Sequence, residues 1–167
     1  AQSKLSSLKA VSDTYPLRGA LQIESSIQGS ATKGPSPGAV WVDAAMLASL
    51  QAKVGDQLKL GNSQFVIGGV LTRELDRGAG FMNFAPRVMM SIEDLPTTGL
   101  LGLGSRVTYR LLLAGADADI QAYDRWANTA IEAQGMRGVR VETLENAQPV
   151  MRKTLERAER FLSLIAL

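Results

Sequence analysis

The sequence predicts an α+β fold, and three patterns lead to that prediction. Short runs with a strand pattern, such as AVWVD and SQFVIGGVL, fill the first hundred residues. A later run, SRVTYRLLLAG, is followed by a long amphipathic stretch and then by GVRVETL, which is the order of a βαβ unit. The chain finishes in a second helical segment. With 167 residues, we expect one domain or two small subdomains.

Composition excludes several classes of function. The chain has no His and no Cys, so it cannot form an imidazole-based or thiolate-based catalytic site, and neither a metal nor a cofactor is predicted. Lys and Arg number 18 against 16 Asp and Glu, a net charge of +2, and no basic block stands out. Aromatic residues make up 5%. This balance argues against nucleic-acid binding, while the lack of Cys suits a cytosolic or a disulfide-free periplasmic protein.

The first half of the chain is expected to be mostly strand. The stretch KLSSLKAVSDTYPLRGALQI predicts two strands around a turn, and residues 28–38, rich in Ser, Gly and Pro, predict a loop or linker. AVWVD predicts a strand whose Asp43 caps a helix over 44–53, with Met46, Leu47 and Leu50 on one face.

A hairpin is expected next. DQLKL and SQFVIGGVL are separated by Gly61 and Asn62, a favoured two-residue connection. DRGAG predicts a flexible loop and PRVMMS another strand. Ser91 stands three residues before Asp94, close to a capping-box pattern, so a short helix is expected to follow.

The third segment predicts strand, helix and strand. In SRVTYRLLLAG, the residues Val107, Tyr109, Leu111 and Leu113 alternate as on a half-buried strand. The following stretch predicts a helix with a stripe of mostly apolar residues along one face and two further apolar residues beside it. The helix is expected to end near Gly135, because glycine readily adopts the left-handed conformation of a helix C-terminus. The stripe contains Ile120, Tyr123, Ala127, Ala130 and Gln134, flanked by Trp126 and Ile131.

The last segment, from Pro149, predicts a stalk helix. Its apolar positions follow a narrow spacing of four and three residues: Met151, Leu155, Ala158, Leu162 and Ile165. No charge follows Arg160, so the helix becomes apolar all round, as at the start of a membrane span. The first residues lack the apolar core of a signal peptide, and we expect both ends to be cut from a longer chain.

Three candidate site types have simpler explanations. The glycines of GLLGLGS, Gly99, Gly102 and Gly104, precede a strand-like run and lack the Lys of a phosphate-binding loop. The carboxylate pairs Glu74 and Asp76, Glu93 and Asp94, and Asp117 and Asp119 fit caps or solvated turns better than acid-base or cation sites. No spacing supports a Ser-Lys site around Lys33.

One loop stands out as a candidate contact surface. Phe81, Met82 and Phe84 cluster beside Gly78 and Gly80. Such a cluster either folds back as part of a core or forms a contact surface. We hypothesise that at least one of Phe81 and Phe84 is exposed to meet a partner.

GAVWVDAAMLASL followed by KVGDQLKLGNSQFVIGGVL is similar to a recurrent element in the extracytoplasmic domains of ABC-transporter permeases of the MacB/FtsX-like class. KAVSDTYPLRGALQI, FAPRVMMSIEDLPTTGLLGLGSRVTYRLL and RAERFLSLIAL resemble the predicted permease usually found beside a lysophospholipase/arylesterase and an ATPase subunit. The resemblance runs along almost the whole chain.

The resemblance implies a particular organisation. Residues 1–35 would be a partial first half of a porter unit with a linker, and 36–98 an inserted, mostly β subdomain. Residues 99–148 would be the second porter half, a βαβ unit, and 149–167 a stalk leading into a transmembrane span. The family carries a further strand-helix-strand stretch upstream of LKAV, which this chain does not contain.

The resemblance also implies a function. The chain would be the periplasmic domain of a bacterial inner-membrane permease, with no catalytic residues and no cofactor. Two permeases would assemble in each complex. The chain would couple a cytoplasmic ATPase to a lipid-like substrate or a periplasmic esterase. The stalk residues Met151, Leu155, Ala158 and Leu162 would carry the coupling. A carboxylate-based hydrolase and a soluble ligand-binding module are the alternatives.

Overall fold

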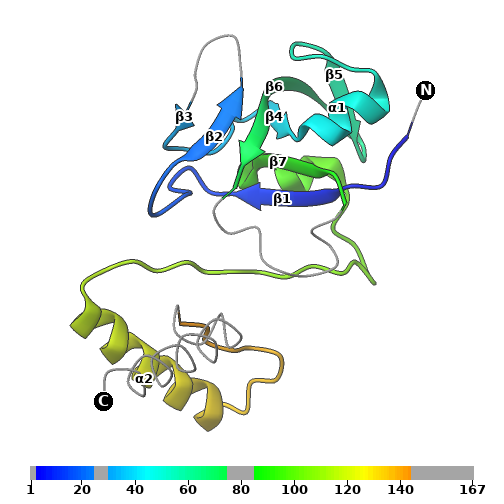
Figure 1. Cartoon of the computed structure of the whole chain (residues 1–167). Helices are drawn as coiled ribbons and strands as arrows, with labels where there is room; N and C mark the ends of the chain where they lie inside the picture. Colours follow the sequence, from blue (N-terminus) through cyan, green and yellow to red (C-terminus); the bar gives the residue numbers. More distant parts are fainter. Residues whose placement is uncertain (1–2, 25–29, 75–84, 144–167) are drawn as a thin grey trace, which may run out of the picture. The chain divides into compact units, whose positions relative to one another are not determined.

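The computed structural model describes residues 3–24, 30–74 and 85–143, and the chain divides into two compact units, Ala1–Leu112 and Leu113–Leu167. Within the described residues, the first unit is built on a seven-stranded sheet (Figure 1). Its strands are β1 (Ser7–Val11), β2 (Leu21–Glu24), β3 (Ser30–Ala31), β4 (Ala39–Val42), β5 (Gln57–Leu60), β6 (Ser63–Arg73) and β7 (Arg87–Ser91). This mixture of strands and helices confirms the α+β prediction.

The sheet is mixed and strongly curled. Its order is β1-β7-β4-β6-β2-β3, with β5 paired to β6 off this path. The pairs β1–β7 and β4–β6 are parallel, and the other pairs are antiparallel. Strands from residues 7–24 therefore pair in the same sheet as strands from 39–91. The four-part domain division implied by the resemblance stays a prediction.

β6 is the longest strand and pairs with three others. Its first half pairs with β5, its second half with β2, and its middle with β4. A register shift against β4 places Ile67 opposite Val40 but Gly69 opposite Trp41, so Gly68 is an extra residue. Because one extra residue exchanges the two faces, Phe65 and Ile67 belong to one core while Leu71 belongs to the other.

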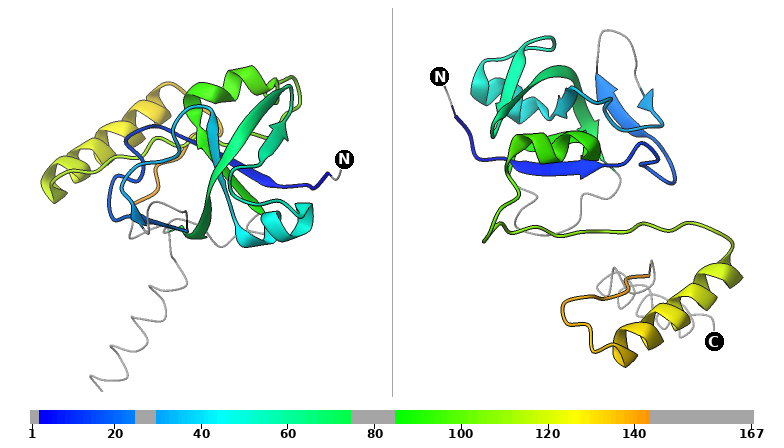
Figure 2. Two further views of the ribbon diagram at one scale, coloured as in Figure 1. Left: turned by 90° about the horizontal axis from the view of Figure 1, so that it is seen from above. Right: turned by 180° about the vertical axis from the view of Figure 1, so that it is seen from behind.

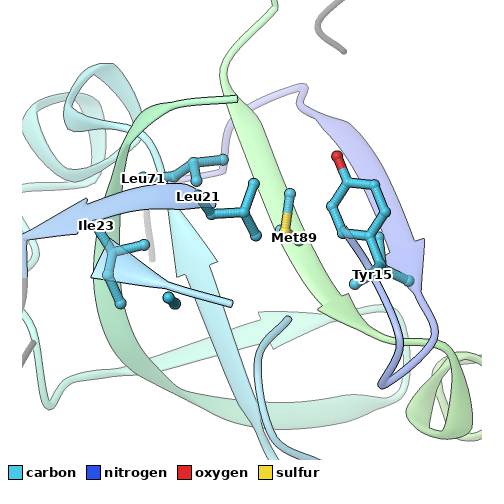
Figure 3. Close-up of a cluster of buried hydrophobic side chains, with 7 residues drawn as sticks. Tyr15, Leu21, Ile23, Leu71 and Met89 are labelled. Atoms are coloured by element: carbon cyan, nitrogen blue, oxygen red, sulfur yellow. The ribbon is translucent and has the colours of Figure 1, made fainter. Parts of the chain in front are cut away.

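Two buried clusters occupy the two faces of the sheet. One, drawn in Figure 3, contains Val11, Tyr15, Leu21, Ile23, Ala31, Leu71 and Met89, with Trp41 against it. The other contains Val40, Val42, Met46, Phe65, Ile67, Val88 and Met90. Alternation along β4 and β7 sends successive side chains to opposite clusters, which explains why all five residues of β7 are buried.

Two short helices cover the second cluster. α1 (Ala44–Leu50) contributes Met46, with Leu47 and Leu50 packed beside it. The 3-10 helix η2 (Ile92–Thr98) contributes Leu95, which packs on the same cluster as Leu8 of β1. Figure 2 (right) shows η2 lying along β1, and η2 also contacts β7.

The caps predicted for these helices are present. The Asp43 carboxylate accepts a 2.9 Å hydrogen bond from the Met46 N–H, and the Ser91 hydroxyl accepts one from the Glu93 N–H. α1 ends at Leu50 rather than near residue 53, because Gln51 adopts a left-handed conformation. Asp94 does not complete a capping box, since its carboxylate accepts a 2.7 Å bond from the Gly38 N–H.

The other strands expected in the first half are also confirmed. Residues 7–11 and 21–24 flank the predicted turn, and Leu60 pairs with Ser63 so that Gly61 and Asn62 form the two-residue hairpin loop. β3 lies inside the stretch expected to be an irregular loop. Its two residues pair with Leu21 and Gln22 at the edge of the sheet.

The predicted βαβ unit requires a correction. Its helix is present as α2 (Asp117–Ala133), with Gly135 at a φ of 59° just beyond the C-terminus. The strands predicted at 105–115 and 138–144 are wrong for the described residues, which adopt no strand over 105–115 or 138–143. A strand requires a hydrogen-bonded neighbour, and these stretches find none among the described residues.

Candidate functional site

The predicted contact and stalk residues lie outside the described residues. Phe81, Met82 and Phe84 fall in 75–84, and Met151, Leu155, Ala158 and Leu162 fall in 144–167. The structure therefore leaves both hypotheses as predictions. What it does describe is the pair of strands that flank residues 75–84.

A buried ion network joins those two strands to β1. Glu74, directly after β6, has a side chain that is 1% exposed. One of its carboxylate oxygens lies 2.5 Å from Lys9 Nζ and the other 3.1 Å from Arg87 Nε. Lys9 comes from β1 and Arg87 opens β7. A single carboxylate thus links three segments that are far apart in sequence.

Further polar groups satisfy the two cations. Lys9 Nζ donates to the Tyr15 hydroxyl at 2.8 Å and lies 4.3 Å from the centre of that ring. Arg87 Nη1 donates to Ser7 Oγ at 2.7 Å. Each cation therefore has a second partner besides Glu74, which offsets part of the cost of removing charge from water.

Asp43 ties the same region to α1. One carboxylate oxygen caps the helix, and the other accepts a 2.9 Å bond from the Arg87 N–H. The Asp43 N–H in turn donates to the Arg87 carbonyl at 3.1 Å. Among the described residues, no buried side-chain nitrogen or oxygen lacks a hydrogen-bond partner. These satisfied groups suit a positioning network rather than an acid-base pair.

Sequence reasoning missed this network. It noted Glu74 only as half of a carboxylate pair with Asp76, because the partners are 65 and 13 residues away. The available signal was a charged residue inside each of two apolar strands, Lys9 in SLKAV and Arg87 in RVMMS. A charge in such a position needs a partner, but the pattern alone does not identify it.

The glycine-rich stretch forms a hydrogen-bonded loop. Ser105 Oγ donates to the Leu100 carbonyl and accepts from the Gly102 N–H, both at 3.0 Å. Leu103 extends from it fully exposed. The loop follows η2 and opens no helix, so its context differs from that of a phosphate-binding loop.

The carboxylate pairs occupy separate places. Asp117 and Asp119 lie in the first turn of α2, where negatively charged side chains interact favourably with the helix dipole. Glu93 and Asp94 lie in the first turn of η2. Over the described ranges, no group of three or more acidic residues is arranged to hold a metal ion.

The region after η2 exposes large apolar side chains. Tyr109 and Leu111 are 78% and 79% exposed in the stretch predicted as a strand. On α2, Trp126 is 63% exposed and its ring centre lies 5.3 Å from that of Tyr123. Of the predicted stripe, Ala127 is buried. In the part of the chain that the structure describes, no helix has the length and apolar character needed to cross a membrane.

Comparisons with known proteins identify one informative relative. An uncharacterized ABC transporter permease of Escherichia coli (strain K12), YbbP, is 31% identical over 164 residues. The match covers 98% of this chain but 19% of that protein, so the chain spans about a fifth of the relative's length. No family model matches the chain, and no solved structure matches it. The identity supports a domain related to part of an ABC transporter permease.

Proposed function

We propose that this chain is the extracytoplasmic domain of an ABC-type permease, on the periplasmic side of a bacterial inner membrane. The observation that carries the proposal is the 31% identity to an ABC transporter permease along 98% of the chain. The lack of His and Cys is consistent with a role other than catalysis. An ATPase subunit in the cytoplasm would be the partner of the whole permease, and two permeases would assemble in the complex.

The domain would couple ATP hydrolysis to work outside the membrane. The stalk from Pro149 would transmit the motion of the membrane helices, with Met151, Leu155, Ala158 and Leu162 on its packing face. Phe81, Met82 and Phe84 would engage a lipid-like substrate or a periplasmic esterase. The ion pair between Glu74 and Arg87 supports this proposal, because it joins the two described segments on either side of residues 75–84.

The first experiment tests the permease assignment in the full-length protein. We would purify it from its own membranes through an affinity tag and identify the proteins that accompany it. We expect an ATPase subunit in stoichiometric amount and ATP hydrolysis by the complex. A full-length protein that is recovered from the soluble fraction without an ATPase would contradict the assignment.

Two variants of the full-length permease then test the parts. Ala158→Pro should interrupt a stalk helix and abolish coupling, because proline removes a backbone hydrogen bond and clashes with the preceding turn. Phe81→Ser with Phe84→Ser should weaken substrate or partner capture. Leu5→Ser with Leu103→Ser is the matched control, since both leucines are exposed. Equal effects of the two double variants would contradict a specific contact role.

A further inference from the structure

The first and last strands of the sheet are adjacent and parallel. Ser7 pairs with Arg87 and Val11 with Ser91, in an unbroken register of five residues. A pull on the chain before Ser7 and a pull on the chain after Ser91 therefore act in opposite directions along the two strands. Such a load shears all the hydrogen bonds of the pair together instead of opening them one at a time.

The incoming strand is braced where a pull would reach it. The Ser7 N–H donates to the Pro86 carbonyl at 2.8 Å, and Arg87 Nη1 donates to Ser7 Oγ at 2.7 Å. Glu74 binds Lys9 of this strand and also Arg87, from its position directly after β6. Charge-assisted bonds in a buried setting are stronger than neutral ones, so β1 is held firmly to the C-terminal end of β6.

The outgoing helix η2 is fastened to the opposite end of β6. The Asn62 N–H donates to the Thr98 carbonyl at 2.8 Å, and Ser63 Oγ donates to the Thr97 carbonyl at 2.8 Å. Gly61 allows this approach, because a Cβ there would lie 2.0 Å from the Thr98 carbonyl oxygen. Thr98 itself is fully buried.

These contacts connect into one path. Glu74 lies at the C-terminal end of β6 and Ser63 opens its N-terminal end, so the strand runs between the two attachment points. β6 is also the strand that pairs with β2, β4 and β5. We propose that β6 is a tie between the incoming strand β1 and the outgoing helix η2, so that the first unit carries tension between its two connections without unfolding.

This inference rests on the proposed function, in which the permease pulls on the domain through its connections. The experiment that tests it does not depend on that function. Because the chain has no Cys, thiol handles can be placed at Lys4→Cys and Leu101→Cys, and a force between them loads β1 against β7 and η2. Both positions are exposed. Handles at Gln22→Cys and Lys53→Cys, also exposed, load β6 through β2 and through the α1–β5 connection, by contacts that involve neither Glu74 nor Ser63. The measurement is the lifetime of the folded chain under constant force.

Glu74→Gln should shorten the lifetime about tenfold on the Lys4–Leu101 axis, since it removes the charge that both cations share. On the Gln22–Lys53 axis we expect Glu74→Gln to change the lifetime by no more than about twofold. Glu142→Gln is the control variant, and it should change the lifetime by no more than about twofold on either axis, because the Arg140–Glu142 pair is exposed. Equal shortening on both axes would overturn the proposal. If the network only stabilised the fold, its loss would weaken the fold in every direction of pulling. No shortening on the first axis would also overturn it.

Ser63→Ala keeps the proposal testable if Glu74→Gln does not fold. It removes only the hydroxyl that holds Thr97, at the other end of β6. We expect a shorter lifetime on the Lys4–Leu101 axis by about threefold and no change on the other axis. An unchanged lifetime on both axes would contradict the tie. These outcomes concern the chain alone, so they are distinguishable from failure to recover an ATPase with the full-length protein.

Discussion

The stretches RVMMS at 87–91 and VTYRLLL at 107–113 both have the composition of a strand, but only one of them is a strand. In the first, β7 lies between β1 and β4, and all five residues are buried. In the second, no described residue pairs with the backbone, and Tyr109 and Leu111 stay exposed. The pattern therefore indicates that a segment can form a strand, while the presence of a neighbouring strand decides whether it does.

The same contrast extends to the sheet as a whole and the chain beyond η2, and the largest expected difference between these two regions concerns their ion pairs. Glu74→Ala leaves two cations without their shared carboxylate in a buried setting, and we expect a loss of about 3–5 kcal/mol in the free energy of unfolding. Glu142→Ala removes the partner of an exposed Arg140 and should cost at most about 1 kcal/mol. Denaturant unfolding of both variants measures this difference. Losses of similar size would contradict the distinction between the regions.

A pair of leucines gives the next test. Leu21 is fully buried in the cluster of Figure 3, so Leu21→Ala should cost about 2–5 kcal/mol through lost packing and a cavity. Leu111→Ala should change the free energy of unfolding by no more than about 0.5 kcal/mol. Thermal and denaturant melts of the two variants provide the comparison. A destabilisation by Leu111→Ala close to that of Leu21→Ala would show that Leu111 is packed in solution.

Substitutions at two glycines distinguish the cost of a steric clash from the cost of a left-handed backbone. Gly61 and Gly55 both have positive φ, but a Cβ at Gly55 would meet nothing within 4 Å. Gly55→Ala should therefore cost about 1 kcal/mol, from the left-handed backbone alone. Gly61→Ala should cost about 2–3 kcal/mol, because the hairpin must also move away from Thr98. Equal melting temperatures for the two variants would argue against the contact between the hairpin and η2.

Much of the first unit could be predicted from local chemistry. Asp43 before an apolar helix, Gly61-Asn62 between two strand patterns, and Ser91 before IEDL each specify a cap or a turn through nearby atoms. The bulge at Gly68 could not be predicted, since two adjacent glycines indicate only that a bulge is possible. β3 was missed because two residues at a sheet edge carry no pattern of their own.

The candidate site depended on contacts that local patterns do not contain. The Lys9–Glu74–Arg87 network forms only when β1, β6 and β7 meet in the folded sheet. The two strands of the expected βαβ unit were wrong for the same reason, because pairing is a property of the neighbours. The helix between them was predicted well, since the hydrogen bonds of a helix lie within its own segment.

Hydrogen exchange of the backbone amides tests the central comparison most directly. It measures, residue by residue, whether an amide is held in a hydrogen bond that opens only when the structure unfolds. In the 167-residue chain we expect the amides of Val88 to Met90 to exchange only through unfolding of the sheet. Those of Tyr109 to Leu111 should exchange at nearly the rate of an unfolded peptide. Comparable protection of the two stretches would contradict the account, because 107–113 would then have a pairing partner.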